Sequence, residues 1–183
     1  MRTFYTLILT ISLGFLTQTI AFAQSEVNWM SLEEAVVAQK NEPRKIVMDV
    51  YTQWCGPCKM MMANTFTNPQ VIAYLNANYY AVKFDAESKD PINFKGQTFE
   101  NPGYKEGVRG RNSTHQLSRE LRVNAYPTLV YFDEKAEVIA PISGYKNPGQ
   151  LEMYLKFFSQ HFTPGVQQQE WEEFRDTFVP TFR

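Results

Sequence analysis

The fold of this chain is decided by residues 45–59, which read KIVMDVYTQWCGPCK. The first half is a short apolar run rich in Val and Ile, which predicts a strand buried on both faces. From Gly56 onward the residues are good helix formers, and Pro57 lacks an N–H group that would otherwise want a partner. We therefore predict a buried strand, a tight turn and a helix that begins at the cysteines.

Cys55 and Cys58 are the only two cysteines of the 183 residues. Two cysteines on one turn close a small ring, which adds little stability through loop entropy. A tetrahedral zinc site needs more ligands, and His115 and His161 are far away in sequence. Zinc, an intersubunit iron–sulfur cluster and a purely structural disulfide remain as alternatives. We interpret the pair as a dithiol that is oxidised and reduced in place, with no metal and no other cofactor.

A Cys-x-x-Cys pair at the start of a helix has a direct chemical consequence. Free backbone N–H groups and the positive end of the helix dipole favour a thiolate at the first cysteine. Cys55 is therefore the expected nucleophile, and Cys58, one turn further on, is expected to resolve a mixed disulfide. Gly56 leaves room for a substrate chain, and Pro57 keeps the turn stiff.

The rest of the chain alternates helices and strands. Ser31 and Glu34 form a capping box for one helix, and Asn68-Pro69 opens another. Further strands are expected at residues 79–85, 128–132 and 138–142, and further helices at 113–122, 148–161 and 166–178. This order predicts an α/β fold with a mixed sheet, helices on both faces and one antiparallel edge.

Residues 86–112 form an insertion that lacks apolar periodicity and is rich in Gly, Pro, Asn and Lys. A loop of this length inside a compact domain is either functional or an inserted flap. Its aromatic and basic residues are candidates for flanking the dithiol and choosing partners: Phe94, Phe99, Tyr104, Arg109 and Arg111. An ornamental surface flap is the alternative.

The first 23 residues are expected to be a cleaved signal peptide. Arg2 precedes an apolar stretch at residues 7–20, and Ala21-Phe22-Ala23 matches an A-x-A cleavage site. An uncleaved anchor helix is the alternative, although the stretch is short for one and carries Thr and Gln. We expect a periplasmic or secreted protein without stable membrane insertion after signal removal.

Charge and length set further limits. The formal net charge is −1 with acids and bases mixed along the chain, which argues against nucleic-acid binding and against a polybasic membrane patch. The length favours a single domain, expected at residues 24–163 and including the insertion, followed by a helical tail at residues 164–183. We expect a monomer.

Residues 54–59 resemble the active site of the thioredoxin family, and the similarity extends over about residues 45–158. Tyr126-Pro127-Thr128 is similar to the cis-proline loop, which in that family lies against the dithiol. Asp49 stands six residues before Cys55, where thioredoxins keep a buried acid that manages protons for the second cysteine. The resemblance therefore implies a thioredoxin-like fold.

Among the branches of the family, the exported bacterial one is the most similar, including the C-terminal domain of the transmembrane reductant conductor. The shared features are the Cys-x-x-Cys-Lys-x-Met helix and the Thr65-Phe66 that follows it. Gly144 also resembles a glycine of the closing strand.

The roles that the resemblance implies have physical reasons. An acid in a buried strand is costly to ionise, so we expect Asp49 to have a raised pKa and to accept the proton of Cys58. A cis peptide at Tyr126–Pro127 would expose backbone groups to an extended substrate, and Trp54 would cover the dithiol. The alternatives are a solvent-accessible acid, an ordinary trans proline and a plain core tryptophan.

In thioredoxin a lysine of the neighbouring strand pairs with the buried acid. Here the aligned position is read as Ala81, with Lys83 two residues further on. Because side chains two residues apart share one face of a strand, we expect Lys83 to replace it beside Asp49.

The resemblance implies thiol–disulfide exchange with protein disulfides, with electrons supplied by a membrane or soluble donor. Gly-Pro between the cysteines is the thioredoxin pair, and thioredoxin has a potential of about −270 mV against about −120 mV for a strong oxidant. A reductase or isomerase role is therefore expected. A net oxidase, or a partner-binding or chaperone-like module on the same fold, remains as an alternative.

Overall fold

The structure, a computed structural model, describes residues 25–183. The expected signal peptide at residues 1–23 lies outside the described residues. Within the described part, none of the helices combines the length and the apolar character needed to cross a bilayer.

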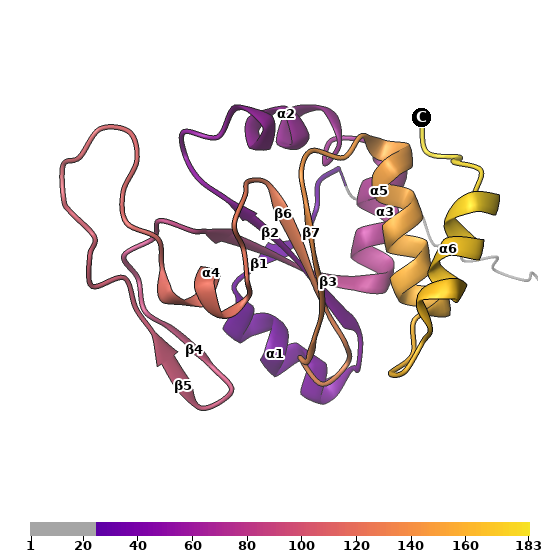
Figure 1. Cartoon of the computed structure of the whole chain (residues 1–183), viewed down its shortest axis with the longest axis horizontal. Helices are drawn as coiled ribbons and strands as arrows, with labels where there is room; N and C mark the ends of the chain where they lie inside the picture. Colours follow the sequence, from indigo (N-terminus) through magenta and orange to yellow (C-terminus); the bar gives the residue numbers. More distant parts are fainter. Residues whose placement is uncertain (1–24) are drawn as a thin grey trace, which may run out of the picture.

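A five-stranded mixed sheet forms the centre of the molecule (Figure 1). In spatial order its strands are β1 (Trp29–Met30), β3 (Tyr79–Asp85), β2 (Lys45–Tyr51), β6 (Thr128–Phe132) and β7 (Val138–Ser143). β1, β3 and β2 are parallel, whereas β6 is antiparallel to β2 and β7 is antiparallel to β6. The expected mixed α/β sheet is confirmed. β1 was not predicted, because two residues are too few to show a periodic pattern.

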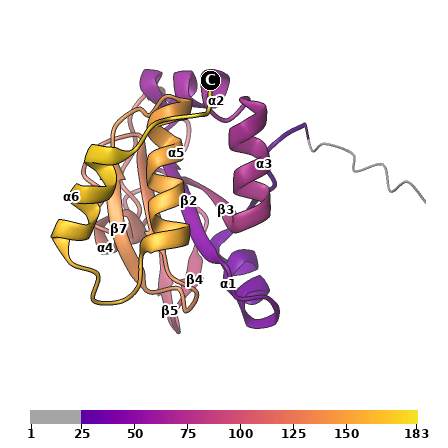
Figure 2. The same cartoon turned by 90° about the vertical axis from the view of Figure 1, so that its right-hand side faces the viewer.

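Helices cover both faces of the sheet (Figures 1 and 2). They are α1 (Leu32–Asn41), α2 (Gly56–Asn64), α3 (Pro69–Asn78), α4 (Gln116–Glu120), α5 (Pro148–Lys156) with a π-helical continuation at Phe157–His161, and α6 (Gln168–Thr177). α1 and α4 pack with Met48 and Val50 of β2 on one face. α3 and α5 pack with Val47 on the other. Asp49 shares the side of Val47, because side chains alternate along a strand.

The predicted helix starts are confirmed at the level of single hydrogen bonds. The Ser31 hydroxyl accepts from the backbone N–H of Glu34, and the Glu34 carboxylate accepts from the N–H of Ser31. The Asn68 side chain likewise accepts from the first backbone N–H groups of α3, with Pro69 at its first position. These caps satisfy N–H groups that have no partner inside the helix.

The insertion departs from the predicted irregular flap. It contains a hairpin of β4 (Ile92–Phe94) and β5 (Gln97–Phe99). Phe94 and Phe99 are only 5% and 4% exposed, and the Phe94 ring lies 5.9 Å from that of Phe132 in the core. The expectation that these two rings flank the dithiol is therefore wrong. They attach the insertion to the face covered by α1 and α4.

The C-terminal tail packs against α5. α6 lies beside α5 (Figure 2). The Trp171 ring of α6 packs against the ring of Phe157, the residue after α5, at a centroid distance of 4.9 Å. The last residues then return along α5, where the buried Glu152 carboxylate accepts hydrogen bonds from the backbone N–H groups of Thr181 and Phe182. The same carboxylate forms an ion pair with Lys156 at 2.6 Å. One buried acid thus holds the end of the chain to the domain.

Candidate active site

The two cysteines lie at the junction of β2 and α2 and are joined by a disulfide with an S–S distance of 2.02 Å. Cys55 is the N-cap residue of α2, and its sulfur accepts a hydrogen bond from the backbone N–H of Cys58 at 3.1 Å. Both side chains are buried, with 2% and 3% exposure. A helix N-terminus with an N–H group directed at the sulfur stabilises a thiolate at Cys55.

Pro127 lies at the same end of the sheet as the cysteines. It directly precedes β6, whose Thr128 pairs with Val50 near the end of β2. The peptide bond between Tyr126 and Pro127 is cis. The Pro127 carbonyl accepts from the N–H of Gly144 at 2.7 Å, and Gly144 has a φ of +89°, which favours glycine. The sheet therefore brings the two segments that resemble the family beside each other.

Trp54 extends this arrangement to the surface. Its ring packs edge-to-face against Tyr126, with a centroid distance of 5.9 Å, and 36% of the residue is exposed. Its indole N–H donates to the Glu87 carboxylate at 2.9 Å. The Arg111 guanidinium lies over the ring at 4.4 Å from the centroid. The tryptophan is thus a half-exposed wall beside the dithiol.

Asp49 is buried in the middle of β2, with 2% exposure. Burial raises the pKa of its carboxyl from 3.8 to about 6, and the charge of Lys83 opposes this rise. Its Oδ1 atom has no hydrogen-bond partner within residues 25–183. A carboxyl with such a pKa exchanges a proton near neutral pH, as a proton acceptor for a thiol must.

The strand register decides which residue faces this acid. Asp49 stands directly opposite Lys83 on β3, whereas Ala81 stands opposite Val47. Lys83 therefore lies beside the buried acid, as expected, although the comparison with thioredoxin had read Ala81 as the position equivalent to the family's lysine. Its ammonium donates to the Met62 sulfur at 2.7 Å and lies 4.8 Å from the centre of the Tyr51 ring. Burial lowers the pKa of Lys83, and the charge of Asp49 opposes that shift.

A cavity of about 440 Å³ opens beside Cys58. Its walls come from β2, the turn after it, α2 and β3: Tyr51, Thr52, Gln53, Cys58, Lys59, Met62, Ala63 and Lys83. The second cysteine and the lysine that faces Asp49 therefore border one space. Of the two cysteines, only Cys58 lines this cavity.

The insertion contributes less to the site than its composition suggested. Of its five candidates, Arg111 contacts Trp54, and Phe94 and Phe99 belong to the core. Arg109 is exposed. Glu87 was missed by sequence reasoning, although its position just after β3 was a signal, because β3 ends at the same edge of the sheet as β2.

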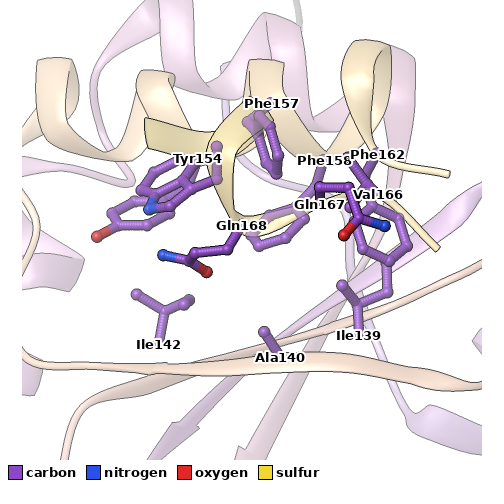
Figure 3. A pocket seen from close by; sticks show the side chains of 11 residues that line it. Ile139, Ala140, Ile142, Tyr154, Phe157, Phe158, Phe162, Val166, Gln167 and Gln168 are labelled. Atoms are coloured by element: carbon purple, nitrogen blue, oxygen red, sulfur yellow. The ribbon is translucent and has the colours of Figure 1, made fainter. Parts of the chain in front are cut away.

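A second cavity, of about 340 Å³, lies between α5, α6 and β7, and none of its lining residues belongs to the dithiol site (Figure 3). Aromatic rings form one wall and β7 residues the other: Tyr154, Phe157, Phe158 and Phe162 face Ile139, Ala140 and Ile142. Trp171 also lines the cavity. It is a product of how the C-terminal tail packs, which no local sequence pattern predicts. Within residues 25–183, no group of three or more His, Cys, Asp or Glu side chains is arranged to hold a metal ion.

The fold and the dithiol at the start of α2 define a class of protein. The chain belongs to the thioredoxin-like domain family, whose sequence model matches residues 32–159. Its redox group is the Cys55–Cys58 pair itself, as in the thiol–disulfide oxidoreductases of this family.

Particular relatives are similar at modest identity. The chain is 24% identical over 124 residues to the thiol:disulfide interchange protein DsbD of Pectobacterium atrosepticum, which covers 67% of this chain and 18% of that protein. It thus spans about a fifth of the length of the DsbD relatives that it matches. It is also 29% identical over 117 residues to thioredoxin C-3 of Corynebacterium nephridii, covering 63% of this chain and 59% of that one.

Solved structures agree on the fold. A candidate disulphide-isomerase from Bacteroides thetaiotaomicron is 26% identical and superposes with a TM-score of 0.51, covering 77% of this chain and 100% of that one. The oxidoreductase DsbH superposes with a TM-score of 0.52 at 18% identity, covering 79% of this chain and 90% of that one.

Proposed function

We propose that this protein is an exported thiol–disulfide oxidoreductase that reduces or isomerises protein disulfides. The observation that carries the proposal is the position of Cys55, which caps α2 and whose sulfur accepts the N–H of Cys58. The names of the DsbD and thioredoxin relatives support the same chemistry.

The proposed reaction has two steps. The Cys55 thiolate attacks one sulfur of a substrate disulfide, so that a mixed disulfide forms and the other substrate sulfur leaves as a thiolate. Cys58 then gives its proton to Asp49 and attacks the Cys55 sulfur, which releases the second substrate thiolate and closes the Cys55–Cys58 disulfide. Two electrons pass from the dithiol to the substrate, and a membrane or soluble dithiol donor must restore the reduced form.

The substrate surface is proposed to consist of Trp54, Gly56, Pro57, Tyr126 and Pro127. A Cβ atom added at Gly56 would meet nothing within 4 Å, so the space beside Gly56, between the two cysteines in sequence, is open to an incoming chain. The half-exposed Trp54 adds an apolar wall beside that space. We propose that backbone groups of Tyr126 pair with an extended segment of the substrate.

Export rests on the sequence pattern of residues 1–23, with an apolar stretch before an A-x-A site. We propose that the signal is removed, that the mature domain covers residues 24–163, and that residues 164–183 form a tail that packs on it. The packing of α6 and of the last residues against α5 supports this division. We propose a monomer in the periplasm or outside the cell.

Reduction of insulin disulfides tests the activity. The wild-type protein with a dithiol donor should precipitate the insulin B chain, and Cys55→Ser should abolish the reaction because the attacking sulfur is gone. Cys58→Ser should instead trap the mixed disulfide. If Cys55→Ser kept the biological activity of the protein, a partner-binding role on this fold would replace the enzymatic one.

The direction of exchange is tested by equilibrating the pair with glutathione or dithiothreitol buffers. A reductase or isomerase should have a potential closer to that of thioredoxin, about −270 mV, than to that of a strong oxidant, about −120 mV. A value near the oxidant would make the protein a net oxidase.

A further inference from the structure

The insertion reaches the dithiol through Trp54, and it does so from both of its ends. Glu87, at its beginning, accepts the indole N–H at 2.9 Å. Arg111, at its end, places its guanidinium 4.4 Å from the centre of the indole ring. Trp54 directly precedes the attacking cysteine and packs against Tyr126 of the cis peptide. Arg111 is therefore a surface group at the border of the proposed substrate surface.

Arg111 has no carboxylate within ion-pair distance among residues 25–183. Its side chain is exposed. A guanidinium that lies over an aromatic ring retains N–H donors at its edge, and these fit the two oxygens of a carboxylate. The stacking also limits the orientations of the guanidinium, so less freedom is lost when an acid binds.

The acidic groups nearby already have donors. The Asp85 carboxylate accepts from the Gln53 side chain at 2.9 Å and from the backbone N–H of Glu87 at 3.0 Å. The Glu87 carboxylate accepts from Trp54. Arg111 is thus an exposed cation at this border that lies over Trp54 and has no ion-pair partner within residues 25–183.

We propose that Arg111 is a specificity-determining residue that favours disulfides flanked by an acidic side chain. The substrate class is an extended protein segment with Asp or Glu within a few residues of the cysteine under attack. This inference rests on the proposed thiol–disulfide exchange and adds to it a reason for the insertion.

The test uses two disulfide-bonded peptides that differ only in having Glu or Lys beside one cysteine. For the reduced full-length protein, kcat/KM should be about two- to fivefold higher for the Glu peptide, which is the size expected of an exposed ion pair. The preference should shrink as salt is added, because exposed charges are screened. Arg111→Gln should remove the preference, and Arg111→Glu should reverse it in favour of the Lys peptide.

Arg109→Gln is the matched control, since Arg109 is an exposed arginine two residues away on the same loop. This variant should keep the preference. Three outcomes would overturn this inference and leave the proposed function standing. They are equal rates of the wild-type protein on the two peptides, a preference of the wild-type protein for the Lys peptide, and an unchanged preference in Arg111→Gln. An absence of exchange with insulin and with both peptides would overturn the proposed function, and this inference with it.

Discussion

Asp49 is a residue whose burial has opposite effects on stability and on chemistry. Folding places its carboxyl in β2 with little solvent contact, and burial raises its pKa to about 6. The ionised form is therefore less stable in the folded protein than in the unfolded chain. The same shift makes the group a proton acceptor near neutral pH, which is the property that the proposed reaction needs.

Asp49→Asn should therefore stabilise the folded protein and slow its thiol–disulfide exchange. A folded pKa raised above the unfolded value of 3.8 means that stability is full below pH 3.8 and falls as the pH rises through about 6. At pH 8 the variant should gain on the order of 2–3 kcal/mol in free energy of unfolding, since each pKa unit corresponds to about 1.36 kcal/mol. Denaturant unfolding at several pH values measures this gain.

The kinetic half of this prediction is a slower release of the mixed disulfide, by about tenfold or more, because general-base assistance of this kind contributes on the order of 10²–10⁴. At pH 3 the two proteins should unfold at the same denaturant concentration, which is the internal control. An equal stability difference at pH 3 and pH 8 would show that the carboxyl does not titrate as argued.

At the scale of elements, the β4–β5 hairpin is a part of the core and not an appendage. Two three-residue strands bury Phe94 and Phe99 in the core on the α1 side of the sheet. The connection between them passes through Lys95 and Gly96 with φ of 50° and 76°, a left-handed pair that suits a tight hairpin turn. The hairpin also anchors the insertion whose end carries Arg111.

Phe94→Ala should cost about 3–5 kcal/mol of stability, because it removes a buried ring and leaves a cavity against Phe132. Chemical denaturation of the oxidised protein measures the loss. Gln97→Ala is the control on the same hairpin: its side chain is exposed, so the change should stay within about 0.5 kcal/mol. A loss below about 1 kcal/mol for Phe94→Ala would mean that the hairpin is a surface flap after all.

At the scale of the whole molecule, residues 181–183 are hydrogen-bonded to α5 and to the start of α3. The fully buried Glu152 carboxylate binds Lys156, the Thr181 hydroxyl and the backbone N–H groups of Thr181 and Phe182. Burial by itself would raise the pKa of Glu152, but these hydrogen bonds together hold it below its usual value. The Asn68 side chain also donates to the Arg183 carbonyl at 2.7 Å, so the tail joins α5 to the start of α3.

Glu152→Gln should loosen this tail while leaving the dithiol chemistry intact. A charged hydrogen-bond acceptor of this kind contributes about 1.5–3 kcal/mol, which the amide only partly replaces. Limited trypsin digestion should then cut faster at Arg175 in α6, and insulin reduction should proceed at the wild-type rate. Unchanged cleavage would show that the aromatic contacts of α6 hold the tail without the hydrogen bonds of Glu152 to Thr181 and Phe182.

The stabilisation by the Glu152 hydrogen bonds to Thr181 and Phe182 should also depend on pH in the wild-type protein. Because the folded pKa of Glu152 is lowered, its contribution is present above the unfolded value of 4.5 and is lost as the pH falls through the folded value. The difference in unfolding free energy between wild type and Glu152→Gln should therefore decrease in acid.

Local chemistry made much of the molecule predictable from its sequence. Ser31, Asn68 and Pro57 act on the backbone within one helical turn, and the run at residues 45–51 shows its burial by composition alone. The same holds for Cys55 and Cys58, whose three-residue separation at a helix start defines their chemistry wherever the helix lies. Strands of two or three residues, such as β1 and β4, are too short to produce a periodic signal.

The remaining features depend on contacts between residues far apart in the chain. That Lys83 and not Ala81 faces Asp49 follows from the pairing register of β2 with β3, where a shift of two residues changes the neighbour without changing the face. The contact of Arg111 with Trp54 and the hold of Glu152 on the chain end likewise join segments separated by tens of residues. Sequence patterns report on neighbours along the chain, so the dithiol, its helix and Asp49 could be identified from the sequence, whereas the register that sets Lys83 opposite Asp49 and the contact of Arg111 with Trp54 were determined by tertiary packing.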